Sequence, residues 1–389
     1  MKNKFVFLPI LFILLISCRT ASETYPAPET SSKQEKTESV SVSPPPITIN
    51  TLTLVAAGDN LFHETIIDSS LKNGVYDFTP IYSEIKSIIE KADLAFINQE
   101  TVMGGVKFGY SGYPAFNTPQ SLAKTIADTG FDIVNQANNH AMDMGKTGLI
   151  ATLDLWDTIE GITVIGARKE GDSAKIITKN NISLGFLSYT YGLNGNVLPK
   201  DSPNLVSLIN RSKMEAEIDA LRPLCDFLVV SMHWGDEYMM EPGKAQIDLA
   251  LFLAEHGVDL IIGHHPHVLQ RVQTITLEDG RKTLCFYSLG NFVSNQREKE
   301  RIIGGMMAVT FTKKEQGLET KELSISDYGM IPVICHFDRG YKNTKVYPLY
   351  SYSEDLLKNH ALKNKDLTLD FFNSVLSKME TKIYTDNPF

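Results

Sequence analysis

Short apolar stretches that each lead into a polar cluster recur along this chain and alternate with amphipathic segments. Residues 51–57 run into the Gly-Asp-Asn triplet at 58–60, and residues 93–97 run into the Asn-Gln-Glu triplet at 98–100. Apolar stretches of this length predict buried strands, and glycine at the exit permits a tight turn. Strands that alternate with helices predict an α/β sheet whose polar residues gather at the carboxyl ends of the strands.

The same alternation continues through the rest of the chain. Helices are expected at 79–91, 146–160 and 244–256, and residues 176–187 are expected to form a hairpin that turns at Asn180-Asn181. A mostly helical pattern returns at 354–384. Further strands are expected at 131–134, 226–232, 258–262, 283–289 and 306–311, the last two in a second sheet or at a sheet edge.

The N-terminus has the features of an export signal. Lys2 and Lys4 precede an apolar run that is too short for a membrane span. The run ends in Leu-Ile-Ser-Cys, which resembles the bacterial lipobox and predicts acylation of Cys18; an ordinary signal peptide with an incidental cysteine is the alternative. The following Ser-, Thr-, Pro- and Glu-rich stretch predicts a flexible linker. The predicted layout is a signal peptide at 1–17, a lipid-anchored linker at 18–50, a folded domain at 51–335 and a partly helical extension at 336–389.

Composition excludes some classes of protein. The 389 residues are 43% hydrophobic, which is enough for a full core. A formal net charge of −9 argues against a nucleic-acid binder. The cysteines form no CxxC pair, so no redox motif or structural zinc site is predicted, and Cys225, Cys285 and Cys335 are expected to be small buried hydrophobes.

Carboxylates, a carboxamide and imidazoles recur at the predicted strand ends. His265 and His267, one residue apart, leave the strand at 258–262 and can turn both rings toward one point. These side chains are the ligand types of zinc, manganese and iron. A lone pair of histidines is more often structural, but the recurrence favours a metal or polar catalytic centre. The residues concerned are Asp59, Glu100, Asn139, His140, His233, His265 and His267.

The loop after residues 131–134 also places a carboxylate close to an imidazole in the sequence. Asp143 follows His140 closely enough to hold its ring through the second nitrogen. The alternative is that Asn138 and Asn139 are turn formers and that His140 is an ordinary surface histidine.

Six motifs follow one another between residues 51 and 310. Together they resemble the bacterial capsule synthesis CapA, or poly-gamma-glutamate synthesis, family, which is similar in turn to the calcineurin-like metallophosphoesterases. The resemblance is specific for the family and much less so for a reaction. The motifs are Ala57-Gly-Asp59, Asn98-Gln-Glu100, Ala137-Asn-Asn-His-Ala-Met-Asp143-Met-Gly145, His233-Trp-Gly-Asp-Glu-Tyr238, Gly263-His-His-Pro-His267-Val and Tyr287-Ser-Leu-Gly-Asn-Phe292.

The resemblance implies a metallophosphoesterase-like, layered β-sandwich flanked by helices, with a helical C-terminal extension. It implies that His140 stabilises a transition state or protonates the leaving group, with Asp143 orienting its ring. One or two divalent metal ions, Mn, Zn or Fe, would occupy the centre. The implied metal ligands are Asp59, Glu100, Asn139, His233, His265 and His267.

Two motifs depart from the metallophosphoesterase pattern. These enzymes usually begin with Asp-x-His, whereas the nearest histidine after Asp59 is His63, which we expect to be a polar residue rather than a ligand. The usual bridging aspartate is replaced by the triplet that ends in Glu100. His264 is expected to support the ligands from behind or to lie at the mouth of the site, rather than to be a ligand. The number of metal ions, or whether any binds, therefore stays open.

Three residues within the motifs, Trp234, Glu237 and Asn291, are predicted to bind substrate. For Trp234 and the neighbouring Tyr238, packing is the alternative, because buried aromatic side chains at strand ends usually belong to the core.

Two functions are compatible with these features. The first is an exported, membrane-anchored metal-dependent hydrolase or transferase of capsule or poly-gamma-glutamate synthesis or processing, which acts on a phosphoester or on an amide of an anionic polymer. The second is a non-catalytic accessory that binds the polymer during assembly or export, alongside other capsule-assembly proteins. In both, the domain faces the periplasm or the exterior and binds no nucleic acid.

Overall fold

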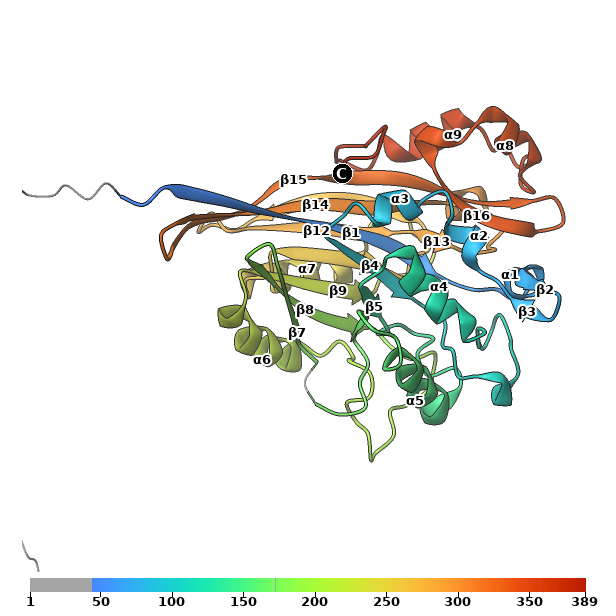
Figure 1. The fold of residues 1–389 in the computed structure, drawn as a ribbon, viewed down its shortest axis with the longest axis horizontal. Coiled ribbons are helices and arrows are strands. Elements are labelled where there is room, and N and C mark those ends of the chain that lie inside the picture. Colours follow the sequence, from blue (N-terminus) through green and yellow to red (C-terminus); the bar gives the residue numbers. More distant parts are fainter. Residues whose placement is uncertain (1–43, 172) are drawn as a thin grey trace, which may run out of the picture. The chain divides into compact units, whose positions relative to one another are not determined.

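Two β-sheets packed face to face form the centre of the molecule, with helices on their outer sides (Figure 1). This computed structural model describes residues 44–171 and 173–389. Cys18, the predicted signal peptide and most of the predicted linker lie outside the described residues. Residues 45–389 form one unit by their internal contacts.

The first sheet has eight strands and joins a parallel half to an antiparallel half. The parallel half consists of β1 (Ile47–Asn60), β4 (Leu94–Gln99), β5 (Ile133–Asn135) and β6 (Thr163–Ile165). The antiparallel half adds β14 (Ile303–Gln316), β15 (Glu319–Asp338) and β16 (Lys342–Pro348), and the short β13 (Asn291–Val293) pairs with the end of β1. The long β1 therefore connects the two halves.

The second sheet has six strands with a parallel centre. The centre consists of β8 (Ile182–Thr190), β9 (Phe227–His233), β10 (Leu260–His264) and β12 (Lys282–Leu289). Its antiparallel edges are β7 (Lys175–Lys179) and β11 (Leu269–Thr276). The expected hairpin at Asn180-Asn181 is confirmed, since it joins β7 to β8 with both asparagines at positive φ. A separate small hairpin pairs β2 (Leu71–Lys72) with β3 (Val75–Tyr76).

The alternation of side chains along β1 explains why the sheets stack. Leu54 and Ala56 belong to the apolar cluster between the sheets, where they share one core with Phe186 of β8. Val55 and Ala57 point to the other face and belong to the cluster beneath the helices. Both faces of β1 are therefore buried, and the layered α/β sandwich that the sequence predicts is confirmed.

Helices cover the outer faces of both sheets and close one end of the sandwich (Figure 1). Among the described residues, no helix is long and apolar enough to cross a membrane. The first sheet is covered mainly by α1 (Glu64–Ser70), α2 (Thr79–Tyr82), α3 (Lys86–Ile89), α4 (Ser121–Thr129) and α5 (Gly145–Trp156). The second sheet is covered by α6 (Arg211–Leu221) and α7 (Lys244–Glu255), and the C-terminal helices are α8 (Glu354–Asn359) and α9 (Leu369–Leu376).

Two boundaries differ from the expectation. The single helix expected at 79–91 is divided into α2 and α3, two short helices that each bury isoleucines against the first sheet. The domain boundary expected after residue 335 falls inside β15, and β16 still extends the sheet. The partly helical extension therefore begins after Pro348.

The carboxyl ends of the central parallel strands of both sheets meet at one place, where two glycines allow close approach of the backbone. A Cβ on Gly58 would lie 2.1 Å from the carbonyl oxygen of Gly290, and a Cβ on Gly263 would lie 2.0 Å from that of Tyr287. Glycine is therefore required at both strand ends, immediately before Asp59 and His264.

Replacing Gly263→Ala should lower the free energy of unfolding by about 1–3 kcal/mol or more, because the added methyl group meets backbone that cannot rotate away. Gly192→Ala, where a Cβ has no neighbour within 4 Å, is the matched control. Urea unfolding would measure both variants. Equal stability of the two variants would contradict this account of the strand ends.

Candidate metal centre

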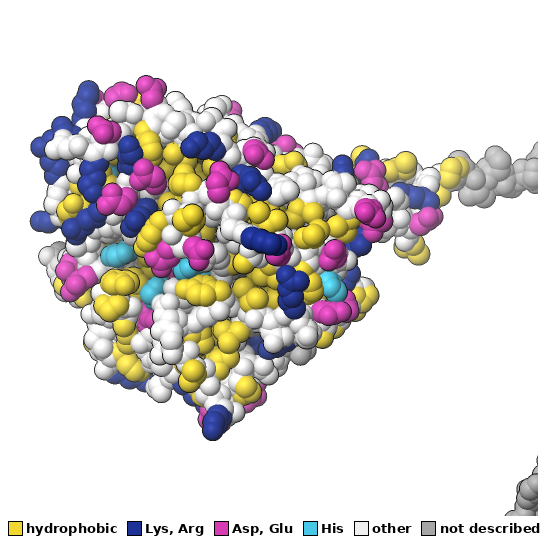
Figure 2. All heavy atoms as spheres, turned by 180° about the vertical axis from the view of Figure 1, so that it is seen from behind, with side chains coloured by type: hydrophobic (Ala, Val, Ile, Leu, Met, Phe, Trp, Pro, Cys, Tyr) yellow, Lys and Arg dark blue, Asp and Glu magenta, His cyan; other side chains and the backbone are white. Residues whose placement is uncertain are grey.

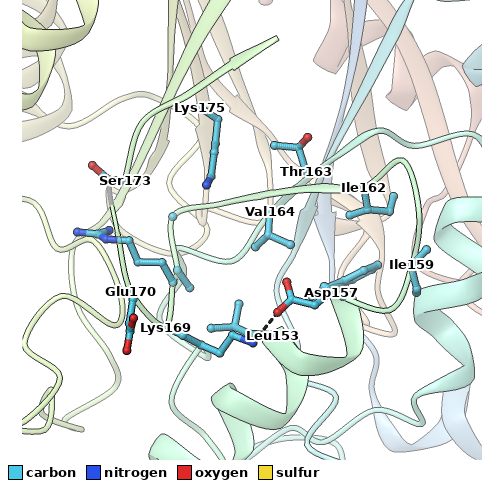
Figure 3. A pocket seen from close by; sticks show the side chains of 14 residues that line it. Leu153, Asp157, Ile159, Ile162, Thr163, Val164, Lys169, Glu170, Ser173 and Lys175 are labelled. Carbon is cyan, nitrogen blue, oxygen red and sulfur yellow. Dashed lines mark hydrogen bonds and ion pairs between the residues drawn. The ribbon is translucent and has the colours of Figure 1, made fainter.

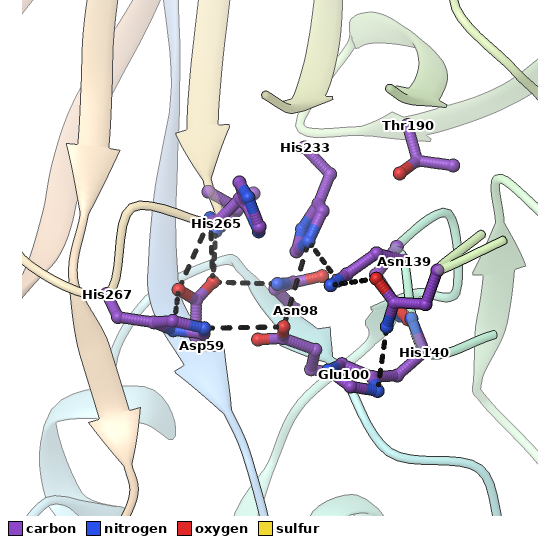
Figure 4. A network of polar contacts seen from close by, with 12 residues as sticks. Asp59, Asn98, Glu100, Asn139, His140, Thr190, His233, His265 and His267 are labelled. Carbon is purple, nitrogen blue, oxygen red and sulfur yellow. Dashed lines mark hydrogen bonds and ion pairs between the residues drawn. The ribbon is translucent and has the colours of Figure 1, made fainter. Parts of the chain in front are cut away.

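Six predicted residues converge from strand ends of both sheets (Figure 4). Asp59 comes from β1, Glu100 follows β4 and His233 ends β9. The loop after β10 supplies His265 and His267, both with positive φ (97° and 58°). A left-handed backbone at a non-glycine residue is strained, so the fold fixes these two rings at a structural cost. Asn139 joins them through the loop after β5.

Asp59 is fully buried and is satisfied by several donors. Its Oδ1 accepts a hydrogen bond from Asn98 Nδ2 (2.8 Å), and its Oδ2 lies 3.1 Å from His267 Nδ1. The backbone N–H of His265 also points to both carboxylate oxygens, at 3.3 and 3.4 Å. Asp59 and His267 therefore belong to one centre, as predicted.

Glu100 is also fully buried, but its two oxygens have no hydrogen-bond partner among the described residues. Oε1 lies 3.7 Å from His233 Nε2 and 3.8 Å from His267 Nε2. The 2.8 Å contact between His233 Nε2 and Asn139 Oδ1 brings a further oxygen to the same place. Glu100 is thus the carboxylate around which the other side chains are arranged.

Unpaired buried polar atoms are costly, and those of this site fit a divalent cation. Two groups of ligand atoms lie within 4.8 Å of one another, Glu100 with His233 and His265, and Asp59 with Glu100 and His267. Within the described part of the chain, His265 Nδ1 also lacks a hydrogen-bond partner. Carboxylate oxygens together with imidazole nitrogens are the donor set of zinc, manganese and iron.

Burial and the neighbouring charges separate the pKa values of these groups. Burial raises the pKa of Glu100 well above its usual range. Burial alone would also raise the pKa of Asp59, but hydrogen bonds with His264 and His267 hold it well below its usual range. Burial opposes the charged form of His267, yet Glu100 and Asp59 raise its pKa to about 9. Without a cation, the centre therefore carries protons that a cation would displace.

The pKa values of the other two predicted histidine ligands, His265 and His233, are shifted in the opposite direction. Burial, followed by the charge of His267, lowers the pKa of His265 to about 4. Burial, together with His265, lowers the pKa of His233 well below its usual value. Both rings are therefore neutral near pH 7, which is the form that binds a metal ion.

The predicted pair of His140 and Asp143 is formed beside the centre. His140 Nδ1 lies 2.8 Å from Asp143 Oδ2, and the same oxygen accepts the backbone N–H of Phe116 at 2.8 Å. Asn194 Nδ2 also lies 3.3 Å from His140 Nδ1. Because the contact with the carboxylate is shorter, we assign a proton to Nδ1, which donates it in a hydrogen bond to Asp143. The Phe116 ring meets the imidazole edge-on at 4.7 Å between centroids. The His140 ring is thus held with Nε2 as its free nitrogen.

Two of the three residues predicted to bind substrate are placed elsewhere. Trp234 is 2% exposed and donates its indole N–H to the carbonyl of Tyr287, so it belongs to the core. Asn291 is fully buried behind His267, and its Oδ1 lies 3.0 Å from His267 Nδ1, where it orients the ring. Glu237 is exposed and lies near His265 and His267, so it alone reaches the surface.

Two histidines of the motif regions that are not predicted ligands, His63 and His264, lie next to the centre. His63 Nδ1 accepts the backbone N–H of Asn295, and His63 belongs to none of the ligand groups found among the described residues. His264 is fully buried, stacks on Phe96 and lies 3.5 Å from Asp59 Oδ1, behind the centre rather than at its mouth.

Several supporting residues were not anticipated from the sequence. Asn135 Nδ2 donates to Asn98 Oδ1 (2.8 Å), and Ser188 Oγ donates to Asn135 Oδ1 (2.6 Å), which links the two sheets behind Asp59. The strand-end position of both asparagines was a usable signal. Tyr191, whose ring lies 4.6 Å from that of His265, follows β8 without any recognisable motif.

A separate cavity of about 740 Å³ lies between α5, β6 and the start of β7 (Figure 3). Among its charged lining residues, Lys169 contacts Asp157 and also reaches the neighbouring Asp154. None of the predicted site residues is among its described lining residues. By contrast, the face drawn in Figure 2 exposes histidines next to acidic side chains, between patches of hydrophobic ones.

Together, the fold and the site define an α/β sandwich protein with a candidate divalent-cation centre at the junction of its sheets. The chain belongs to the family of the bacterial capsule synthesis protein PGA_cap, whose model matches residues 53–296. This match includes every predicted ligand and confirms the resemblance carried by the six motifs.

Two curated relatives come from Bacillus. The chain is 33% identical over 192 residues to the PGA biosynthesis protein CapA of Bacillus subtilis, covering 46% of this chain and 47% of the relative. It is 28% identical over 260 residues to the capsule biosynthesis protein CapA of Bacillus anthracis, covering 61% and 60% respectively. The chain thus spans about half to three fifths of the length of these relatives.

Solved structures show more distant similarity. NAD nucleotidase (NadN) of Haemophilus influenzae matches with a TM-score of 0.43 at 13% identity, covering 87% of this chain and 58% of that chain. The sulfate thiohydrolase SoxB of Thermus thermophilus matches with a TM-score of 0.40 at 14% identity, covering 84% and 60%.

Removal of a central ligand should strongly weaken metal binding. We expect His233→Ala to weaken zinc or manganese affinity by at least about 10²-fold, whereas Lys244→Ala, at the exposed start of α7 and outside every potential ligand group of the described residues, should leave it unchanged.

Binding should also release protons, because Glu100 and His267 have raised pKa values, and affinity should therefore increase from pH 6 to pH 8. Isothermal titration calorimetry in buffers of different ionisation enthalpy measures both quantities. Binding without proton release would contradict the protonation states assigned here.

Proposed function

We propose that this protein is a metal-dependent hydrolase or transferase of capsule or poly-gamma-glutamate synthesis or processing, acting on a phosphoester or on an amide of an anionic polymer. The observation that carries the proposal is the buried carboxylate of Glu100, unpaired within the described structure, surrounded by imidazoles and next to the ordered His140–Asp143 pair. Membership of a capsule synthesis family supports the biological setting.

The residues around the centre have separable roles in this proposal. A divalent cation held by Asp59, Glu100 and the neighbouring imidazoles would supply Lewis-acid polarisation of the scissile group. His140 donates a proton from Nε2 to the leaving group, while Asp143 fixes the tautomer and stabilises the charged ring. Tyr191 covers His265 and limits access of water from that side.

The mouth of the site supports an anionic substrate. The Arg301 guanidinium stacks on the Tyr238 ring, with Cζ 3.4 Å from the ring centroid. Tyr238 in turn lies close to His267, with 6.2 Å between the ring centroids. Although the chain is acidic overall, this arginine offers a fixed positive charge beside the centre, which suits a phosphate or carboxylate.

His140→Ala should keep metal content and fold but lower hydrolysis by about 10²- to 10⁴-fold. Asp143→Asn should lose part of the activity, because the carboxamide keeps an acceptor for the ring but removes the negative charge. Hydrolysis of an aryl phosphodiester and of poly-gamma-glutamate would be compared with metal content. Loss of metal from His140→Ala would instead make His140 a ligand. Polymer binding by wild type without hydrolysis of either substrate would favour the accessory function.

We further propose that the protein is exported and anchored through acylated Cys18, because the lipobox-like segment precedes a polar linker. Cys18→Ala should release the protein from the membrane fraction or stop its processing, whereas the conservative change Ser17→Ala should not. Fractionation and mass spectrometry of the mature N-terminus provide the measurement. A Cys18→Ala protein that stays tethered and is cleaved at the same place would disprove the anchor.

A further inference from the structure

Glu237 is the exposed acidic side chain of a third potential ligand group. Its carboxylate oxygen and one ring nitrogen each of His265 and His267 lie within 4.8 Å of one another. The two imidazoles are buried, at 3% and 2% exposure, whereas Glu237 lies at the surface. This group is therefore on the solvent side of the centre, and the fully buried Asp59 and Glu100 are on its inner side.

The fold holds the Glu237 loop against the histidine loop. The backbone N–H of Tyr238 donates to the carbonyl of Pro266 at 2.8 Å, which joins the two loops midway between His265 and His267. Tyr238 has a positive φ of 69°, as do both histidines. Such backbone conformations persist only where the surrounding structure imposes them. The fold therefore fixes the backbone next to Glu237 against the histidine loop.

Electrostatics favours a cation as the partner of this group. Within the described chain, His265 Nδ1 is buried without a hydrogen-bond partner. A carboxylate at the mouth would repel the anionic groups of a substrate, but together with two imidazoles in the neutral form, which His267 reaches when a cation displaces its proton, it is a typical set of ligands for zinc. Glu237 therefore suits an ion better than the substrate role expected from the sequence.

The two rings also belong to the inner groups, His265 with Glu100 and His233, and His267 with Asp59 and Glu100. An ion held at the mouth could therefore reach the buried position by exchanging Glu237 for Glu100 while it keeps contact with a histidine. We propose that Glu237, His265 and His267 form an outer cation-binding position through which the buried centre is loaded. This inference rests on the proposed metal centre.

The test compares zinc capture by metal-free protein in a stopped-flow experiment, in which a fluorescent chelator reports the loss of free zinc. Glu237→Gln should slow capture by about 10-fold or more, because the first ligand is lost. Asp236→Asn removes the same charge from the adjacent exposed residue of the same loop and should capture zinc close to the wild-type rate. Glu237→Asp keeps the charge but shortens the side chain and should also be slow.

Thermal unfolding of each variant checks that it folds. Capture by Glu237→Gln at the wild-type rate would overturn the inference. Equal slowing by Asp236→Asn and Glu237→Gln would also overturn it, because general attraction of cations by negative charge would then explain the effect. If wild-type protein captures zinc but all three variants match it, only the outer position fails. If wild-type protein binds no zinc or manganese at equilibrium, the proposed metal centre itself fails.

Discussion

The complete burial of two carboxyl groups, Asp59 and Glu100, is the constraint on which the centre of this structure depends. An ionised carboxylate inside a protein costs several kcal/mol unless donors or a cation compensate for the lost water. Asp59 is compensated by the Asn98 amide, the His267 ring and a backbone N–H. Glu100 has no comparable donor in the described structure. Asp59 is therefore stabilised by the protein itself, whereas the carboxylate of Glu100 is available to bind a cation.

The sandwich architecture is what makes this burial possible. Parallel strands deliver their carboxyl ends to one edge of a sheet, and stacking two such sheets brings two edges together. Gly58 and Gly263 let the backbones approach closely at this junction. The bonds from Ser188 to Asn135 and from Asn135 to Asn98 then connect the sheets behind the carboxylates. The polar centre and the apolar sandwich consequently stabilise each other.

Much of this arrangement could be predicted, because an apolar stretch that leads into polar residues marks the end of a buried strand in the sequence. The apolar stretches before Asp59, Glu100 and His233 predicted both the sheets and the side chains that meet. Contacts that depend on tertiary packing were not readable, and Trp234 is the clearest case. Its place next to His233 suggested a pocket wall, whereas Trp234, the first residue after β9, packs its indole into the apolar core together with residues of α7.

Asn291 shows a second limit of sequence reasoning. A polar residue in a motif is equally compatible with contacting substrate and with holding a ligand, and only the 3.0 Å contact with His267 distinguishes these roles. The break between α2 and α3 is a further case, since the apolar pattern of 79–91 fits one helix, whereas the structure divides it into two short helices that both bury isoleucines against the first sheet. Periodicity specifies which side is buried but not the length over which one straight element can follow that surface.

The site also changes in character from its interior to its mouth. Inside, Asp59, Glu100 and His233 are fully buried, so their replacement would disturb both charge compensation and packing. At the mouth, Glu237 and Tyr238 lie on an exposed loop, where substitution changes what approaches the centre with little cost to the fold. Which substrate reaches the centre depends on the exposed part, which a shared fold does not determine.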